Sequence, residues 1–173
     1  MTHDRSSVIV VGVDDAEASV AALVFAMTEA VRRHSAVEAV TAWHFDNPFR
    51  LENGEELAAK VEERARRMQE RAVTRALERV EKAPPVSQVV VRGEFPAQVL
   101  LRAAQDAAFL VVGHTQHRPI VLDRLLGSTS RDCLRHAATP VVVVPWVAQR
   151  AEEATLHEDV VPVDAGAQPS VSR

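Results

Sequence analysis

The stretch VIVVGVD, at residues 8–14, decides the fold class. It is apolar or glycine at every position before its final acid, with no alternation of polar and apolar side chains. Strands of this composition are buried on both faces, as in a parallel sheet that helices cover on each side. Four later segments resemble it, and three of the five are apolar at nearly every position. These four span residues 37–43, 86–91, 109–112 and 141–144. We therefore predict five strands.

Segments with helical spacing of apolar residues separate these strands. Asp15 is the expected N-cap of the first helix, and Pro84 and Pro85 end the long second one. Pro96 begins the third helix, and the fourth is expected over residues 128–137. The expected buried stripes are Val20, Leu23, Val24, Met27 and Val31, then Leu57, Val61, Ala65, Met68, Ala72, Ala76 and Val80, and then Leu100, Ala103, Ala104 and Ala107. Strict alternation of strand and helix predicts right-handed crossovers and an open, doubly wound parallel α/β sheet with helices on both faces.

The chain has 173 residues and is 47% hydrophobic, which is enough for one sizeable core without disulfides or metal. We expect a single α/β domain over residues 1–146. Residues 147–173 contain five acidic residues against two arginines and show no periodic apolar stripe. We expect this segment to be an acidic, disordered tail.

Charge and hydropathy argue against two classes of partner. The net charge of -4 attracts neither nucleic acid nor an anionic membrane. The strongly apolar runs are far shorter than the roughly 20 residues that a membrane-spanning helix needs. The start is polar, no signal-peptide core follows it, and Cys133 is the sole cysteine. We therefore expect a cytoplasmic protein with no membrane and no nucleic-acid partner.

An arginine-rich stretch over residues 64–79 invites a nucleic-acid interpretation, but glutamates are interleaved with its arginines. Glu62 and Arg66, and likewise Glu63 and Arg67, are four residues apart, a spacing that forms ion pairs along a helix. Stacking aromatic residues are absent from the stretch. We interpret it as a solvated helix face.

Candidate site residues follow the expected strands. In an open parallel sheet, ligands bind at the carboxyl ends of the strands, where the strand order reverses. Asp14 follows the first strand, His44 the second, and Gly113-His114-Thr115-Gln116 the fourth. The fourth helix opens with Gly127-Ser128-Thr129-Ser130, whose small residues and free N–H groups suit a phosphate. A carboxylate at one strand end beside such a helix start makes a workable nucleotide pocket.

These motifs carry a family resemblance. VIVVGVD, AVTAWH at 39–44, GEFPAQVLLRAA at 93–104, VVGH at 111–114 and GSTSRDCLRHAATPVVVVP at 127–145 resemble the universal stress protein family, in order over residues 6–146. The resemblance implies a Rossmann-like five-stranded sheet with strand order 3-2-1-4-5. It also implies ATP binding in those members that carry Gly-x-x-Gly, nine residues, and then Gly-Ser or Gly-Thr.

Carried onto this chain, the resemblance assigns Asp14 to the adenine and ribose, and Ala42 to the backbone beside adenine. Gly113 matches the first motif glycine, and Gly127 with Ser128 the closing pair; Thr129 and Ser130 complete the phosphate-binding helix start. Two departures stand out. Gln116 replaces the second glycine, and Gly127 lies fourteen residues after Gly113, where the family pattern has thirteen. A glutamine would be strained there if the position needs a positive φ, and His114, His117 or Arg118 could then supply a cation instead.

Two functions follow from this resemblance. The first is a stress-response sensor that binds ATP, with Mg²⁺, and hydrolyses it slowly or not at all. The second, motivated by Gln116 and the shifted spacing, is a dimeric interaction module that binds no nucleotide. Pairing of the last strand with its copy would make either protein a homodimer, since VVVV between Pro140 and Pro145 is an edge strand. An adenylating or hydrolysing enzyme on a related fold is a third class.

Simpler interpretations stand beside these. Asp14 could cap the first helix together with Asp15, and Gly127-Ser128 could be an ordinary helix start. His114 and His117 lack the third and fourth ligands of a zinc site. Cys133 is expected to be a buried structural thiol. The sequence contains no nucleophile elbow, Walker A loop or zinc-protease motif, so we assign no catalytic residue.

Overall fold

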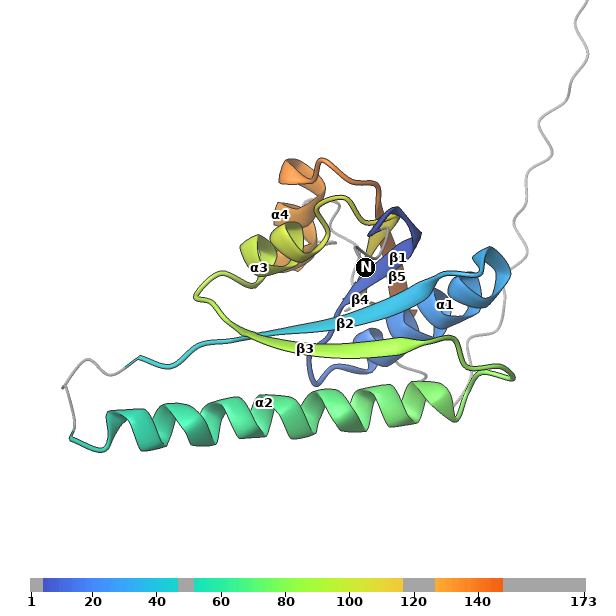
Figure 1. The fold of residues 1–173 in the computed structure, drawn as a ribbon. Coiled ribbons are helices and arrows are strands. Elements are labelled where there is room, and N and C mark those ends of the chain that lie inside the picture. Colours follow the sequence, from blue (N-terminus) through green and yellow to red (C-terminus); the bar gives the residue numbers. More distant parts are fainter. Residues whose placement is uncertain (1–4, 47–51, 117–126, 148–173) are drawn as a thin grey trace, which may run out of the picture.

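The computed structural model describes residues 5–46, 52–116 and 127–147 (Figure 1). A short 3-10 helix, Arg5–Ser7, precedes the first strand. The strands are β1 (Val8–Gly12), β2 (Ala36–Trp43), β3 (Val86–Arg92), β4 (Phe109–Gln116) and β5 (Val141–Val147). The helices are α1 (Glu17–Arg33), α2 (Gly54–Leu77), α3 (Pro96–Ala103) and α4 (Ser128–His136).

The five strands form one parallel sheet with the order β3-β2-β1-β4-β5. This confirms the predicted fold class and strand order. The order reverses at β1, which pairs with β2 on one side and with β4 on the other. A crevice between the carboxyl ends of β1 and β4 is therefore the expected place for a ligand.

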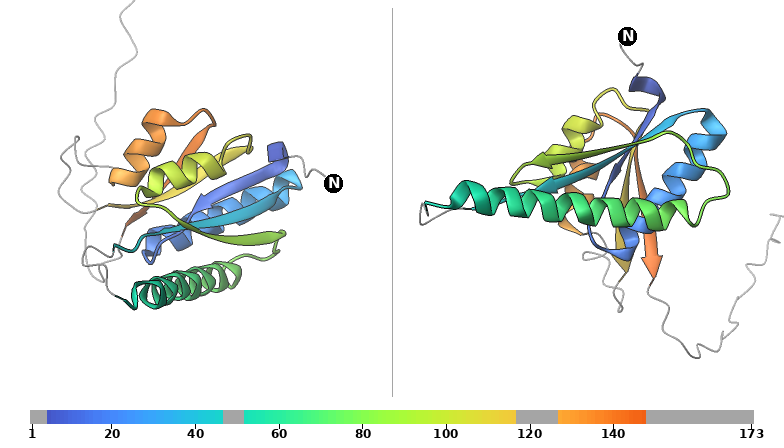
Figure 2. Two further views of the ribbon diagram at one scale, coloured as in Figure 1. Left: turned by 60° about the vertical axis from the view of Figure 1, so that its left-hand side comes forward. Right: turned by 60° about the horizontal axis from the view of Figure 1, so that its bottom comes forward.

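Helices cover both faces of the sheet, as predicted: α1 and α2 lie on one face, and α3 and α4 on the other (Figures 1 and 2). The side chains of β1 divide between these layers. Ile9 and Val11 pack under α1 and α2, whereas Val10 packs under α3 and α4. All three are fully buried, which explains why this strand is apolar at every position.

β2 and β3 are each one residue longer than predicted, and β4 and β5 run several residues further. β4 continues to Gln116 and β5 continues through Pro145 to Val147. Register pairs Pro145 with His114 and Val147 with Gln116. Proline is tolerated at this position because β5 lies at the edge of the sheet, where an N–H pointing away from β4 has no ladder partner. Pairing between the two strands, which no local pattern reveals, extends both.

Three helix boundaries differ from the prediction. Asp15 is not the N-cap of α1: Ala16 occupies that position, and no side chain caps it. α2 ends at Leu77, so Val80 lies beyond the helix, although it still packs against the core. The start of α3 at Pro96 is confirmed, and α4 ends one residue earlier than expected.

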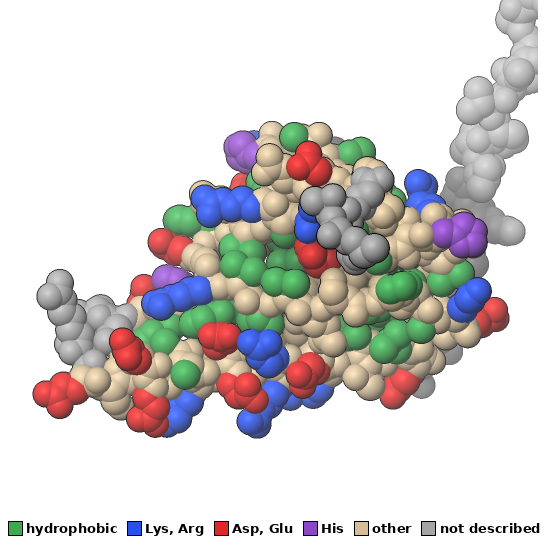
Figure 3. Space-filling view, viewed as in Figure 1, with side chains coloured by type: hydrophobic (Ala, Val, Ile, Leu, Met, Phe, Trp, Pro, Cys, Tyr) green, Lys and Arg blue, Asp and Glu red, His purple; other side chains and the backbone are tan. Residues whose placement is uncertain are grey.

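The expected solvated face of α2 is confirmed. The Arg66 and Arg67 guanidinium groups bond the carboxylates of Glu62 and Glu63 at 3.0 and 2.7 Å, and all four side chains are at least two-fifths exposed. Figure 3 shows basic and acidic side chains interleaved along this side of the molecule. Such a face presents no uninterrupted basic patch to nucleic acid.

The interpretation of Cys133 as a structural thiol is also confirmed. The residue is fully buried between α4 and the sheet. Burial, and to a smaller extent the neighbouring Asp132 carboxylate, raises the pKa of the thiol to about 11. The thiol is therefore neutral at physiological pH and is a poor nucleophile.

Within the described ranges, no helix combines the length and apolar character needed to cross a bilayer. The proposed acidic tail lies outside the described residues, apart from its first residue, Val147.

Candidate functional site

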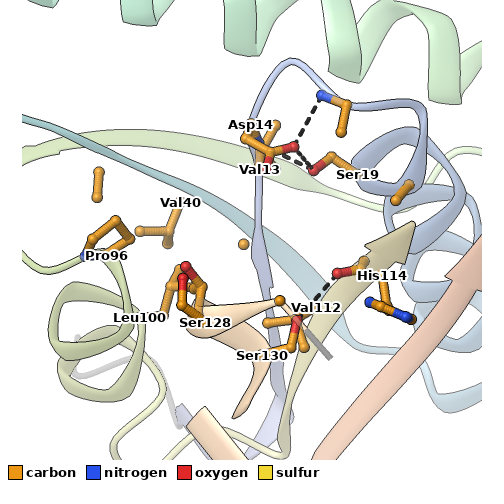
Figure 4. A pocket seen from close by; sticks show the side chains of 17 residues that line it. Val13, Asp14, Ser19, Val40, Pro96, Leu100, Val112, His114, Ser128 and Ser130 are labelled. Carbon is orange, nitrogen blue, oxygen red and sulfur yellow. Dashed lines mark hydrogen bonds between the residues drawn. The ribbon is translucent and has the colours of Figure 1, made fainter. Parts of the chain in front are cut away.

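A pocket of about 420 Å³ opens at the carboxyl ends of β1 and β4, between the starts of α1 and α4 (Figure 4). This volume falls in the roughly 300–1,000 Å³ range of small-molecule sites. All seven predicted site residues line it, although they come from four separate parts of the chain. They are Asp14, Ala42, Gly113, Gly127, Ser128, Thr129 and Ser130.

The pocket has an apolar wall and a polar wall. Val40, Pro96, Leu100 and Val112 join Ala42 on the apolar side. Asp14 and the hydroxyl residues of α4 provide the polar side. The described lining holds no lysine or arginine, and its ionisable side chains are Asp14 and His114. An aromatic ring with a polar, phosphate-bearing end would match this division.

Asp14 has a structural task as well as a place in the pocket. Its Oδ1 accepts hydrogen bonds from the Ala16 N–H at 3.0 Å and from the Ser19 hydroxyl at 2.5 Å, and its own N–H donates to Ser19 Oγ at 3.1 Å (Figure 4). The carboxylate is thus held against the start of α1, but it does not cap the helix as the simpler interpretation proposed, because Ala16 is the N-cap and no side chain caps it. Both contacts use Oδ1, and within the described residues no group donates to Oδ2. As far as the described residues go, this second carboxylate oxygen remains available to a ligand.

Gly113 is required by packing. A Cβ atom at this position would lie 2.4 Å from the carbonyl oxygen of Ala18 and 2.9 Å from the amide nitrogen of Ser19. Backbone atoms of α1 therefore come closer to β4 than any side chain allows. This glycine lets α1 approach β4, which places Ser19 and Asp14 at the edge of the pocket.

The start of α4 provides exposed amide groups. Gly127 is the N-cap and makes no side-chain capping bond, and a Cβ atom there would meet nothing within 4 Å. The N–H groups of the first helical turn have no partner inside a helix, so those at Ser128 and Thr129 can bind an anion. Ser130 differs: its buried hydroxyl donates to the Gly113 carbonyl at 3.3 Å and ties α4 to β4.

Gln116 does not occupy a glycine-type turn. It ends β4 and pairs with Val147, so it has an extended backbone that any residue adopts. The departure from the glycine pattern therefore causes no strain at this position. His117 and Arg118, the alternative cation sources, lie outside the described residues.

His44 does not line the pocket. Its Nε2 lies 2.7 Å from Asp46 Oδ1 on the exposed continuation of β2. The described parts of the chain contain no group of three or more potential metal ligands.

Sequence reasoning missed Ser19 and Val40 as pocket residues. Ser19 is buried in α1, in a segment rich in alanine. Its position five residues after Asp14, which follows the first strand, could have indicated a contact between the two side chains. Val40 was assigned to strand β2 without regard to its face. Its partner across the sheet is Gly12, and although Val40 is only 1% exposed it lines the pocket.

The universal stress protein family model matches residues 6–145. The chain therefore belongs to the universal stress protein family, which confirms the resemblance found in the sequence. It is 32% identical over 152 residues to universal stress protein Rv2623 of Mycobacterium tuberculosis. That match covers 83% of this chain but 46% of Rv2623, so the chain spans about half the length of this relative.

Solved structures agree on the fold. A universal stress family protein from Burkholderia pseudomallei is similar with a TM-score of 0.60 and 27% identity, over 82% of this chain and 98% of that one. A universal stress protein crystallised in complex with cAMP has a TM-score of 0.56 and 25% identity, over 80% of this chain and 95% of that one.

Proposed function

We propose that this protein is a stress-response sensor that binds an adenine nucleotide, specifically ATP with Mg²⁺, in the pocket between β1 and β4. The observation that carries the proposal is the meeting of an apolar wall, a carboxylate and a free helix start around one pocket of about 420 Å³. Adenine would lie against the apolar wall near Val40 and Ala42. The ribose hydroxyls would donate to Asp14 Oδ2, and the phosphates would accept hydrogen bonds from the amides at the start of α4.

Two further observations support an adenine nucleotide. A similar universal stress protein is known in complex with cAMP, which places adenine nucleotides among the ligands of this family. The extended backbone of Gln116 also removes the strain that its replacement of a glycine would otherwise imply. Mg²⁺ would be held by phosphate oxygens and water, because the described lining offers one carboxylate, Asp14.

Nucleotide binding is tested by native mass spectrometry of freshly purified protein and by calorimetric titration with Mg-ATP and with cAMP. We expect saturable heat with Mg-ATP. Gly127→Val should weaken binding by about 10-fold or more, because its side chain would cover amides that make charge-assisted bonds to phosphate. The variant should fold, since the site of its Cβ is open. Thr139→Val, remote from the pocket lining, is the control and should bind like the wild type. Absence of both bound nucleotide and heat in the wild type would refute the proposal.

Dimerisation through β5 is a second proposal, and it is compatible with either function. β5 is an edge strand, and its residues Val141–Val144 are all only partly buried. Its outward N–H and C=O groups would be satisfied by pairing with β5 of a second copy. Pairing would also cover apolar surface that this sheet edge leaves exposed.

Val143→Pro tests the dimer. The Leu110 N–H of β4 donates to the carbonyl oxygen of Pro140. In a parallel ladder, the Val142 N–H must then face β4 and the Val143 N–H must face outward. Position 145, where proline has no N–H, faces outward in the same way. Val143→Pro should therefore remove an edge donor, leave the β4–β5 ladder intact and convert a dimer into monomers in light scattering at micromolar concentration. Val143→Ala keeps the N–H and should remain dimeric. A monomeric wild-type protein would contradict this proposal.

A further inference from the structure

A glutamine is buried between α2 and the sheet. Gln69 lies in α2, is 1% exposed, and fell outside the predicted apolar stripe. Its Nε2 is 3.0 Å from each of three acceptors: the carbonyl oxygens of Ala39 in β2 and Val89 in β3, and the hydroxyl of Thr41. A buried amide without such partners would destabilise the fold, so the burial of Gln69 depends on these three acceptors in β2 and β3.

The Thr41 hydroxyl connects this glutamine to the end of β1. Thr41 is 2% exposed, accepts from Gln69, and donates to the carbonyl oxygen of Val13 at 2.9 Å. The ladder between β1 and β2 ends at the pair Gly12 and Val40. Beyond it, the chain is held to β2 by the Thr41 bond and by the Val13 N–H, which donates to Val40 O at 2.9 Å.

The next residue is Asp14, whose carboxylate is oriented by Ser19 and the Ala16 amide. Hydrogen bonds thus connect Gln69 through Thr41 to the carbonyl oxygen of Val13. The backbone then connects Val13 to Asp14, whose carboxylate lies at the edge of the pocket. We propose that Thr41 and Gln69 are positioning residues, which hold the segment Val13–Ala16 where its carboxylate can meet a ligand. The ligand-binding part of this inference rests on the proposed function, whereas the ordering of the segment does not.

Thr41→Val tests the inference, because valine keeps the shape of threonine and removes the hydroxyl. Thr139→Val is a matched control: its hydroxyl also donates to a backbone carbonyl at 2.9 Å, that of Ala104, away from the pocket lining. The readout is amide hydrogen exchange in ligand-free protein at Val13, Asp14 and Ala16. We expect Thr41→Val to speed exchange at these amides by about 3- to 10-fold, as loss of one hydrogen bond predicts. Thr139→Val and Thr41→Ser should leave these rates unchanged.

The same variants are then titrated with Mg-ATP. Thr41→Val should weaken binding by about 3- to 10-fold, and Thr41→Ser should bind within about twofold of the wild type. Unchanged exchange at Val13–Ala16 in Thr41→Val, or an increase spread evenly over the whole chain, would overturn the inference. If Thr41→Val does not fold, Gln69→Met decides by the same exchange measurement. If the wild type binds no nucleotide, the proposed function fails while the exchange data still decide this inference.

Discussion

Gly113→Ala should destabilise the folded protein by about 3 kcal/mol, the largest stability loss that we expect from any single added methyl group. The added Cβ would lie 2.4 Å from the Ala18 carbonyl oxygen, and the obstructing atoms belong to the backbone. A side chain could rotate away, but here the first turn of α1 must move off β4. Urea unfolding would show a lower midpoint with an unchanged slope.

Gly127→Ala is the matched control for this prediction. It makes the same chemical change in the other half of the family glycine motif, where nothing lies within 4 Å of the new Cβ and φ is -57°. Its unfolding midpoint should equal that of the wild type or exceed it slightly, since alanine loses less backbone entropy on folding than glycine does. A wild-type midpoint for Gly113→Ala would contradict the argument that packing of α1 requires this glycine.

The contrast between these two glycines separates two roles that one motif combines. Gly113 lets α1 approach the sheet, whereas Gly127 keeps the start of α4 accessible. The sequence pattern does not distinguish these roles, because it contains both residues simply as glycines of one motif. The structure indicates that the first acts through α1, by placing Ser19 beside Asp14.

The fold could be predicted from the sequence because its signals are local. A run such as VIVVGV needs burial on both faces wherever it lies, and helical periodicity is visible within a single segment. The ends of β4 and β5 could not be predicted in this way. Gln116 is polar and Pro145 lacks an N–H, yet both remain in the strands because each lies opposite a residue of the neighbouring strand.

The sequence brings the lining of this pocket together, whereas the binding of a ligand by these residues stays a prediction. All seven expected residues line the pocket because strand ends of a parallel sheet meet at one edge. The burial of Gln69 could not be predicted from the sequence, because a polar residue on a charged helix is ordinarily solvated. Its burial depends on acceptors in β2 and β3 that lie 20 to 30 residues away in the sequence.

Asp14→Asn should separate the structural and ligand-binding tasks of this residue. The asparagine Oδ1 can still accept from the Ala16 N–H and the Ser19 hydroxyl, so the start of α1 and the unfolding midpoint should be retained. The other position becomes an NH₂ group, which cannot accept from ribose hydroxyls. We expect affinity for Mg-ATP to fall by about 10- to 100-fold, as loss of charge-assisted hydrogen bonds predicts.

Asp14→Ala completes the comparison, because it removes the bonds to α1 as well as the ligand contact. Its unfolding midpoint should fall below that of Asp14→Asn, while its affinity for Mg-ATP should be equally weak. Calorimetry and urea unfolding on the three proteins measure the two tasks independently. If Asp14→Asn binds Mg-ATP like the wild type and only Asp14→Ala loses affinity, Asp14 acts through the shape of the β1–α1 turn alone. The contact between its carboxylate and the ribose would then have to be abandoned.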